Sequence, residues 1–131
     1  MAGLVLHIPH VSTVIPARER RGILLDDAAL ARELLCMSDH FTDELFMGDG
    51  SRATVVRYPV SRLVVDPERF EVDAQEVMAG RGMGVIYTAT SDLKALRLAP
   101  SAGERARLLN RYYRPHHRRL EAAVSSALSR F

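Results

Sequence analysis

Residues 3–16 read GLVLHIPHVSTVIP, and the rest of the chain is best interpreted from this stretch outward. The apolar run Leu4–Leu6 leads directly into His7 and His10, with Pro9 between the two histidines. A short apolar run bounded by proline is typical of a buried β-strand. Open α/β sheets bind their ligands at the carboxyl ends of the strands, which is where the two imidazoles are expected. The stretch therefore predicts a strand that ends in a polar, metal-competent site.

Length and composition are those of an ordinary globular domain. With 131 residues, 47% of them hydrophobic and 26% charged, we expect a single domain over residues 1–131. No apolar run approaches the roughly 20 residues of a membrane helix, and no signal peptide is apparent, so no membrane partner is expected. Cys36 is the one cysteine, which excludes an intramolecular disulfide and favours a reducing, cytoplasmic location. The net charge of +2 does not by itself indicate a nucleic-acid partner.

Strand-like and helix-like segments alternate along the chain. This alternation predicts an α/β layer fold with a mostly parallel or mixed sheet and flanking helices. After the first strand, the expected strands are residues 53–58, 63–65 and 85–88, which are rich in β-branched or apolar side chains. Helices are expected at residues 28–37, capped by Asp26 or Asp27, and at residues 38–46. The connecting loops are expected at residues 11–22, 70–84 and 91–100.

The longest expected element is a helix from Ser101 to the end of the chain. Ser101 and Glu104 form a capping-box pattern, and apolar residues recur at helical spacing as far as Leu128. Pro115 lacks an amide hydrogen and is expected to kink this helix or to split it in two. The arginines of the helix are interspersed with acidic residues, which favours a solvated face over a nucleic-acid surface.

Two sets of polar residues in the first part of the chain are candidate metal ligands. His7 and His10 lie three residues apart at a strand end, and neutral histidine is the commonest metal ligand. Asp39 and Asp43 share one helix face four residues apart. From these residues alone a second interpretation stays open, in which the histidines bond to loop backbone and the aspartates form a solvated face.

Residues 61–69, SRLVVDPER, combine two arginines and two acids around a short apolar run. Arg62 and Arg69 could bind a substrate carboxylate through bidentate hydrogen bonds or stabilise an oxyanion. The alternative is a structural ion pair, Arg62 with Asp66 or Arg69 with Glu68. The residues themselves leave both interpretations open.

Several motifs, taken together and in order, resemble those of the N-formylglutamate amidohydrolase family. They are HIPHVS, SDHFTDELF, PVSRLVVDPERF, GMGVIYTAT and RYYRPHHRRLEAAV, which cover nearly the whole chain. The resemblance implies a mixed sheet with flanking helices, similar to half of a zinc carboxypeptidase, and a long kinked C-terminal helix. It also implies a metal-dependent hydrolase of N-acyl amino acids such as N-formyl-L-glutamate, in histidine catabolism.

The resemblance assigns roles to individual residues. His10 is implied to be the first ligand of a Zn²⁺ ion and Asp39 its acidic ligand, with His7 in support. Arg62, with a catalytic role in polarising the scissile carbonyl, is implied to bind the substrate together with Asp66 and Arg69. Residues 66–69 are similar to the Asp-x-Asn-Arg turn of zinc carboxypeptidases, with glutamate in place of the asparagine.

The resemblance also predicts an incomplete zinc site. Family members continue past the long helix into a strand with an Asp-x-His-Ser-type motif, whose histidine is implied to be the remaining ligand. His116 and His117 belong to the helix motif and do not replace it. We therefore expect the domain to be truncated at its C-terminal side. Two functions stay open: a hydrolase, inactive if the missing ligand is essential, or a non-catalytic binding or assembly module completed by self-association as a homo-oligomer.

Overall fold

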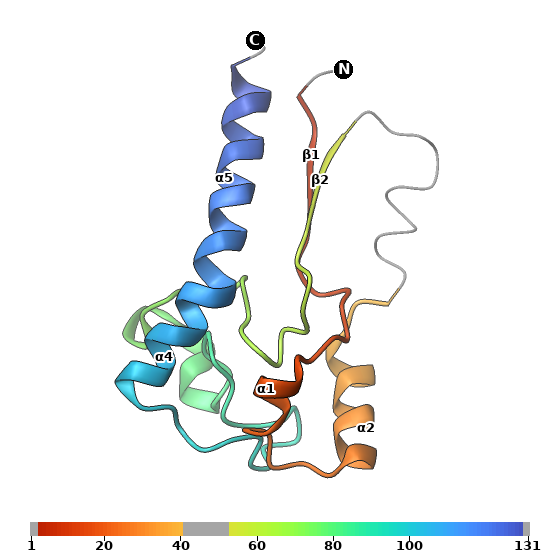
Figure 1. Cartoon of the computed structure of the whole chain (residues 1–131), viewed down its shortest axis with the longest axis vertical. Coiled ribbons are helices and arrows are strands. Elements are labelled where there is room, and N and C mark those ends of the chain that lie inside the picture. The colour runs from red at the N-terminus through yellow and green to blue at the C-terminus, as the bar shows by residue number, and fades with distance from the viewer. Residues whose placement is uncertain (1–2, 41–52, 130–131) are drawn as a thin grey trace.

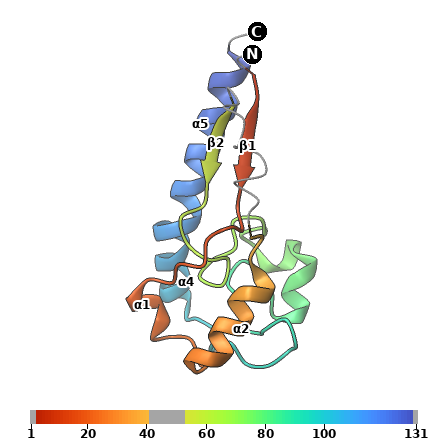
Figure 2. The same cartoon turned by 90° about the vertical axis from the view of Figure 1, so that its right-hand side faces the viewer.

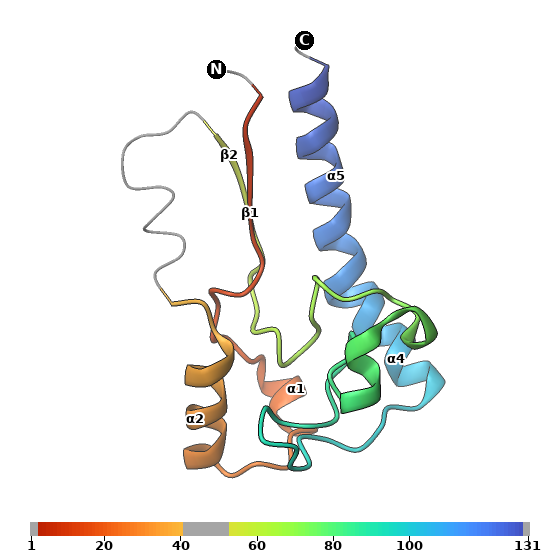
Figure 3. The same cartoon turned by 180° about the vertical axis from the view of Figure 1, so that it is seen from behind.

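The computed structural model describes residues 3–40 and 53–129 and has a mixed α/β architecture (Figure 1). A two-stranded sheet and the long C-terminal helix α5 run side by side along one half of the molecule. The shorter helices and the long loops gather in the other half, as the view from behind also shows (Figure 3). Within the described residues, none of the helices combines the length and apolar character that a membrane span requires.

The sheet is formed by β1 (Val5–Ile8) and β2 (Thr54–Arg57), which are parallel. Val5 lies opposite Thr54 and Ile8 opposite Arg57, and the Tyr58 amide extends the ladder by donating to the Ile8 carbonyl at 3.0 Å. Both strands were expected from their apolar and β-branched residues. Because the strands are parallel, the segments that follow them, with His10 and with residues 58–66, meet at the same end of the sheet (Figure 2).

Residues 63–65 and 85–88 are not strands, so the expected mixed sheet is wrong for the described residues. Leu63, Val64 and Val65 are fully buried, but their backbone turns, with the Val64 amide donating to the Ser61 carbonyl at 3.0 Å. An apolar run indicates burial, and burial alone does not require an extended backbone. Antiparallel pairing in the described part is confined to one isolated bridge between Ala89 and Ala95.

The helix predicted at residues 28–37 is confirmed as α2 (Asp27–Met37). The Asp26 side chain caps it by accepting from the Ala29 amide at 2.8 Å. Ser38 ends it in an extended conformation, and the rest of the next expected helix, from residue 41 on and including Asp43, lies outside the described residues. Three short helical segments occupy stretches expected as loops, namely α1 (Ala17–Arg20), η1 (Asp73–Gln75) and η2 (Val77–Arg81).

The long C-terminal helix has three consecutive parts: α4 (Ala102–Leu108), a π-helical turn η3 (Leu109–Tyr113) and α5 (Arg114–Leu128). The Ser101 hydroxyl caps α4 by accepting from the Glu104 amide at 3.1 Å. Pro115 lies in the first turn of α5, immediately after the π turn, and α4 is inclined to α5 (Figure 3). A proline and a π turn are both known causes of helix kinks, so the expected division of the helix is confirmed.

Two apolar clusters form the core. The first joins the segment after β2 to the 85–86 segment and to the α4–η3 junction, and comprises Tyr58, Val60, Val64, Val65, Val85, Ile86, Leu108 and Leu109. The second packs α2 and the loop before it against the chain near residues 83–96, and comprises Ile23, Leu30, Leu63, Met83, Tyr87 and Leu96. Residues 63–65 contribute to both clusters, which fixes the position of Asp66 directly after them.

Candidate active site

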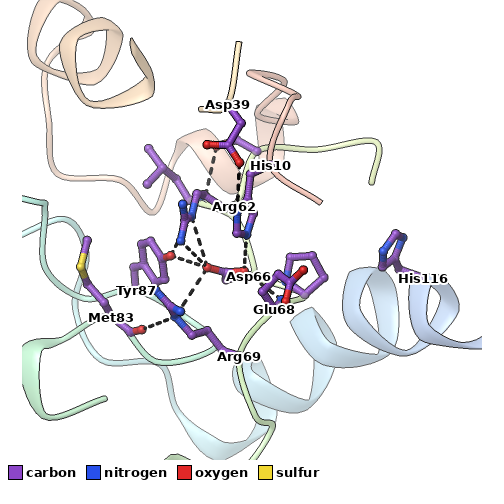
Figure 4. Close-up of polar contacts among 12 residues, drawn as sticks. His10, Asp39, Arg62, Asp66, Glu68, Arg69, Met83, Tyr87 and His116 are labelled. Atoms are coloured by element: carbon purple, nitrogen blue, oxygen red, sulfur yellow. Dashed lines mark hydrogen bonds and ion pairs between the residues drawn. The ribbon is translucent and has the colours of Figure 1, made fainter. Parts of the chain in front are cut away.

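The centre of the candidate site is Asp66, which is fully buried. Its Oδ1 accepts hydrogen bonds from the Glu68 amide at 2.9 Å and from His10 Nε2 at 2.8 Å (Figure 4). Its Oδ2 accepts from Arg62 Nε at 3.2 Å, from Arg62 Nη2 at 3.1 Å and from the Tyr87 hydroxyl. The segments after β1 and β2 thus meet the 83–87 segment at one carboxylate.

These contacts keep Asp66 ionised. Burial by itself would raise the pKa of the carboxyl, but hydrogen bonds from His10 and Tyr87 and the charge of Arg62 outweigh burial and hold that pKa well below its usual range. Burial and the adjacent Asp66 charge raise the pKa of Tyr87, so the phenol stays protonated and donates. The cluster therefore holds a fixed negative charge with cations and donors around it.

The two arginines both turn toward Asp66. Arg69 Nε lies 3.7 Å from Asp66 Oδ2 and donates to the Met83 carbonyl at 3.1 Å. Of the two structural pairs left open by the sequence, the Arg62–Asp66 pair is present, whereas Arg69 pairs with Asp66 in the described part and not with Glu68. The contacts described here engage Nε and Nη2 of Arg62 and Nε of Arg69. Within the described residues, Nη1 of Arg62 and the two Nη atoms of Arg69 take no part in these contacts.

His10 and Asp39, the two expected metal ligands, lie next to each other. His10 Nδ1 is 3.7 Å from Asp39 Oδ2, and the Asp39 amide donates to the His10 carbonyl at 2.7 Å. Because Asp66 is ionised and only accepts, the hydrogen on His10 must be on Nε2. In the neutral imidazole Nδ1 then presents its lone pair toward a carboxylate, an arrangement that a cation between the two groups would stabilise.

The donor set of His10 and Asp39 fits part of a zinc site. Imidazole nitrogen and carboxylate oxygen are both zinc ligands, and a ligating histidine usually donates its other N–H to a carboxylate, as His10 does to Asp66. Zinc sites use three or four ligands, however, and the described residues contain no group of three or more side chains able to hold a metal ion. These two residues therefore fit the ion as a subset of its ligands.

His7 points away from His10 and toward helix α5. Its Nε2 lies 2.7 Å from Nε2 of the fully buried His116, and its Nδ1 lies 3.5 Å from a Glu68 carboxylate oxygen. Arg119 Nη2, which only donates, lies 3.3 Å from His116 Nδ1. Nδ1 of His116 therefore accepts, its Nε2–H donates to His7, and the hydrogen of neutral His7 is on Nδ1, facing Glu68.

The imidazoles of His7 and His116 are both held neutral. Burial, together with smaller effects of the neighbouring His7 and Arg119, lowers the pKa of His116 to about 3. Burial also lowers the pKa of His7, against the opposing effect of Glu68. His7 thus supports the site by linking Glu68 to the long helix, and it lies outside the pair proposed to bind metal.

Sequence reasoning missed two members of the site, Tyr87 and His116. Tyr87 lies in a segment expected to be a strand, where its hydroxyl had no evident partner. His116 falls on the apolar face of the long helix, where a histidine needs a polar partner in the core, and this was the signal that could have identified it.

Comparison with known proteins identifies the family of the chain. The family model for N-formylglutamate amidohydrolase matches residues 2–131. Among solved structures, the chain is similar to N-formylglutamate amidohydrolase from Ralstonia eutropha JMP134, with a TM-score of 0.80 and 26% sequence identity. That alignment covers 98% of this chain and 49% of the Ralstonia chain, so this chain spans about half the length of the solved structure. No curated protein matches the chain. Because the family model covers nearly every residue, the chain belongs to the N-formylglutamate amidohydrolase family.

Proposed function

We propose that this chain takes part in hydrolysis of the amide bond of N-acyl amino acids, with N-formyl-L-glutamate as substrate and Zn²⁺ as cofactor. The observation that supports the proposal best is the convergence of His10, Arg62 and Arg69 on the buried Asp66 carboxylate. Family membership and the name of the similar Ralstonia protein support the same chemistry.

His10 and Asp39 would hold the zinc ion together with further ligands. A bound zinc ion supplies a water molecule with a pKa of about 7 and polarises an acyl oxygen. Asp66 accepts the hydrogen of His10 Nε2 and so fixes the imidazole with Nδ1 directed toward Asp39. The buried position of Asp66 makes this orientation rigid.

Arg62 and Arg69 would bind and orient the substrate. Two guanidinium groups share one buried carboxylate, so one positive charge is left for an anionic substrate. Nη1 of Arg62 and the two Nη atoms of Arg69 can donate to a substrate carboxylate or to the acyl oxygen. Tyr87 stays protonated and holds Arg62 in place, because Arg62 Nε also donates to the Tyr87 hydroxyl at 2.9 Å.

The remaining expectations belong to the same proposal. A distant relation to the zinc carboxypeptidases would explain the Asp66–Arg69 turn. A reducing, cytoplasmic location and a place in histidine catabolism fit a single cysteine and a formylated glutamate substrate.

The test is formate release from N-formyl-L-glutamate by the protein as it occurs naturally. We expect release with added zinc, loss of release after chelation, and recovery when zinc is restored. N-acetyl-L-glutamate in parallel shows whether the site distinguishes acyl groups. If the protein releases no formate in the presence of added zinc, and forms a dimer in solution that retains no metal, the hydrolase proposal is wrong and the assembly module replaces it.

A further inference from the structure

A second polar cavity lies apart from the Asp66 site. Its volume is about 540 Å³, and it opens between α1, the loop that follows α1, and the start of α4. Figure 2 shows α1 beside α4 in the half of the molecule away from the sheet. None of the residues that contact Asp66 lines it. Its charged lining residues are four arginines and two glutamates: Arg18, Arg21, Arg97, Arg107, Glu19 and Glu104.

The two glutamates of this cavity both pair with one arginine, Arg107. Glu19, which is buried, accepts from Arg107 Nη2 at 2.6 Å and from the Tyr112 hydroxyl. Glu104 accepts from Arg107 Nε at 2.9 Å. Burial opposes ionisation of Glu19, but its hydrogen bonds to Arg107 and Tyr112 outweigh burial and lower its pKa. Arg107 therefore serves two carboxylates, and neither is in contact with a second arginine of the cavity in the described part.

Arg97 is the cation that this arrangement leaves without a carboxylate in contact. Its Nη2 donates to the Leu63 carbonyl, while its Nε is shut off from solvent and has no hydrogen-bond partner among the described residues. Burial lowers the pKa of Arg97, which means that its charged form is poorly solvated; Glu19 and Glu104 offset this only in part. Buried cations are normally paired, so an anion beside Arg97 would remove an unfavourable feature.

The rim of the cavity adds two further cations. Arg18 and Arg21 are exposed, and neither forms an ion pair within the described residues. Four arginines against two glutamates leave a net charge of +2 around the cavity. A single arginine cluster of this kind suits phosphate or carboxylate groups, which accept several guanidinium hydrogen bonds at once.

We propose that this cavity is a binding site for a small dianion of the phosphate or dicarboxylate type, with the partly buried Arg97 as its inner cation and Arg18 and Arg21 at its rim. The site is separate from the Asp66 cluster and does not depend on the proposed hydrolase function. Two negative charges match the net charge of the cavity.

The experiment is a calorimetric titration of the whole protein with inorganic phosphate, and in a second arm with succinate, at constant ionic strength and with chelator present. We expect one saturable site per chain. Arg97→Gln should weaken binding roughly tenfold or more, the effect of losing a charge-assisted hydrogen bond in a partly desolvated site. The double variant R18Q/R21Q should weaken it less, about threefold, because exposed charges interact more weakly. The stronger of the two arms identifies the class of anion.

The matched control is Arg81→Gln, which removes an exposed arginine of η2 that does not line the cavity. It changes the net charge by the same amount as Arg97→Gln and should leave binding unchanged. Amide shifts on titration should be largest at residues 18–22 and 97–101. The proposal is wrong if neither anion saturates, if Arg81→Gln weakens binding as much as the cavity variants, or if the largest shifts fall at residues 62–69. Should Arg97→Gln fail to fold, R18Q/R21Q against Arg81→Gln decides the question.

Discussion

The Asp66 cluster and the α1–α4 cavity are both rich in arginine, but their charges are balanced differently. At Asp66, a fully buried carboxylate accepts from His10 and lies in contact with Arg62 and Arg69, so both arginines have an anion in contact. In the cavity, Arg107 takes both carboxylates and Arg97 is left with a backbone carbonyl. Arg62 and Arg69 thus have a carboxylate in contact and can offer only their other nitrogens to a ligand, whereas Arg97 has no carboxylate in contact within the described residues.

This difference shows why arginine content alone does not locate a site. Removing the carboxylate of Asp66 would leave the partly buried Arg62 and Arg69 without their anion, whereas removing Arg97 from the cavity would remove a charge that has no carboxylate in contact within the described residues. Four predictions test this contrast, in order of the expected change in the free energy of unfolding, from the largest to the smallest.

Asp66→Asn should lower the free energy of unfolding by about 3 kcal/mol or more, because it leaves Arg62 and His10 without their shared anion in a buried site. Urea unfolding measures the change. The matched control is Asp73→Asn, whose side chain is 56% exposed and pairs with Arg105 at 3.3 Å. Such a surface pair contributes at most about 1 kcal/mol. Equal losses in the two variants would contradict the view that Asp66 organises the cluster.

His116→Phe should lower the free energy of unfolding by about 2 kcal/mol, because Nε2 of the partly buried His7 loses its donor while the aromatic packing is kept. His116→Gln, which can still donate, should cost less. Histidine nitrogen NMR supplies a second measurement: in the wild-type protein the hydrogens of neutral His7 and His116 should be on Nδ1 and Nε2. The opposite assignments would overturn the Arg119–His116–His7–Glu68 order of contacts.

The two histidines and Asp66 should lower the stability of the protein in different ranges of acid pH. The folded-state pKa of His116 is about 3, against 6.5 for an ordinary histidine, and that of His7 is also lowered. The unfolded chain therefore binds more protons as the pH falls below 6.5, and stability decreases with it. The contribution of Asp66 to stability is still complete between pH 6.5 and about 5, because it is lost only as the pH falls below 3.8 toward the lowered folded-state pKa of Asp66.

Unfolding measured from pH 6.5 to about 5 isolates the histidine effect. Over this range His116→Gln should remove about 1 kcal/mol of the stability loss seen in the wild-type protein. An unchanged pH slope in the variant would mean that His116 is not held neutral by its surroundings.

Arg97→Met should change stability by less than about 1 kcal/mol in either direction, because replacing a buried, unpaired charge by an apolar chain offsets the lost bond to the Leu63 carbonyl. The measurement is urea unfolding, beside Asp66→Asn. A loss of stability as large as that of Asp66→Asn would show that the charge of Arg97 is compensated as fully as that of Arg62. The contrast between the two regions would then disappear.

Local sequence pattern predicted the elements that depend on local chemistry. Helix α2 and its Asp26 cap follow from a cap residue and an amphipathic pattern, and β1 and β2 from apolar and β-branched runs. The division of the long helix follows from Pro115. The apolar pattern of residues 63–65 correctly predicted burial, but it wrongly predicted a strand. The turn that these residues form instead depends on Ser61 and on the packing of the two apolar clusters.

Prediction of the site was limited by contacts between distant parts of the chain. His10 and Asp66 were each recognised, but nothing local says that they share a hydrogen bond across 56 positions of sequence. The resemblance to the family identified the segments that meet and could not identify Tyr87 or His116 as partners. The α1–α4 cavity had no local signal at all, because its charge balance depends on which glutamates Arg107 reaches.

The proposed function requires that the Asp66 cluster leave arginine nitrogens free to bind an anionic N-acyl amino acid. The most direct test is the KM for N-formyl-L-glutamate of the natural, zinc-loaded protein and of its Arg69→Gln variant, with Arg81→Gln as the charge-matched control. We predict that Arg69→Gln raises KM roughly tenfold, the effect of one lost charge-assisted hydrogen bond, with folding intact by circular dichroism. The control should keep the wild-type KM. An Arg69→Gln protein that is folded and has an unchanged KM would contradict the account.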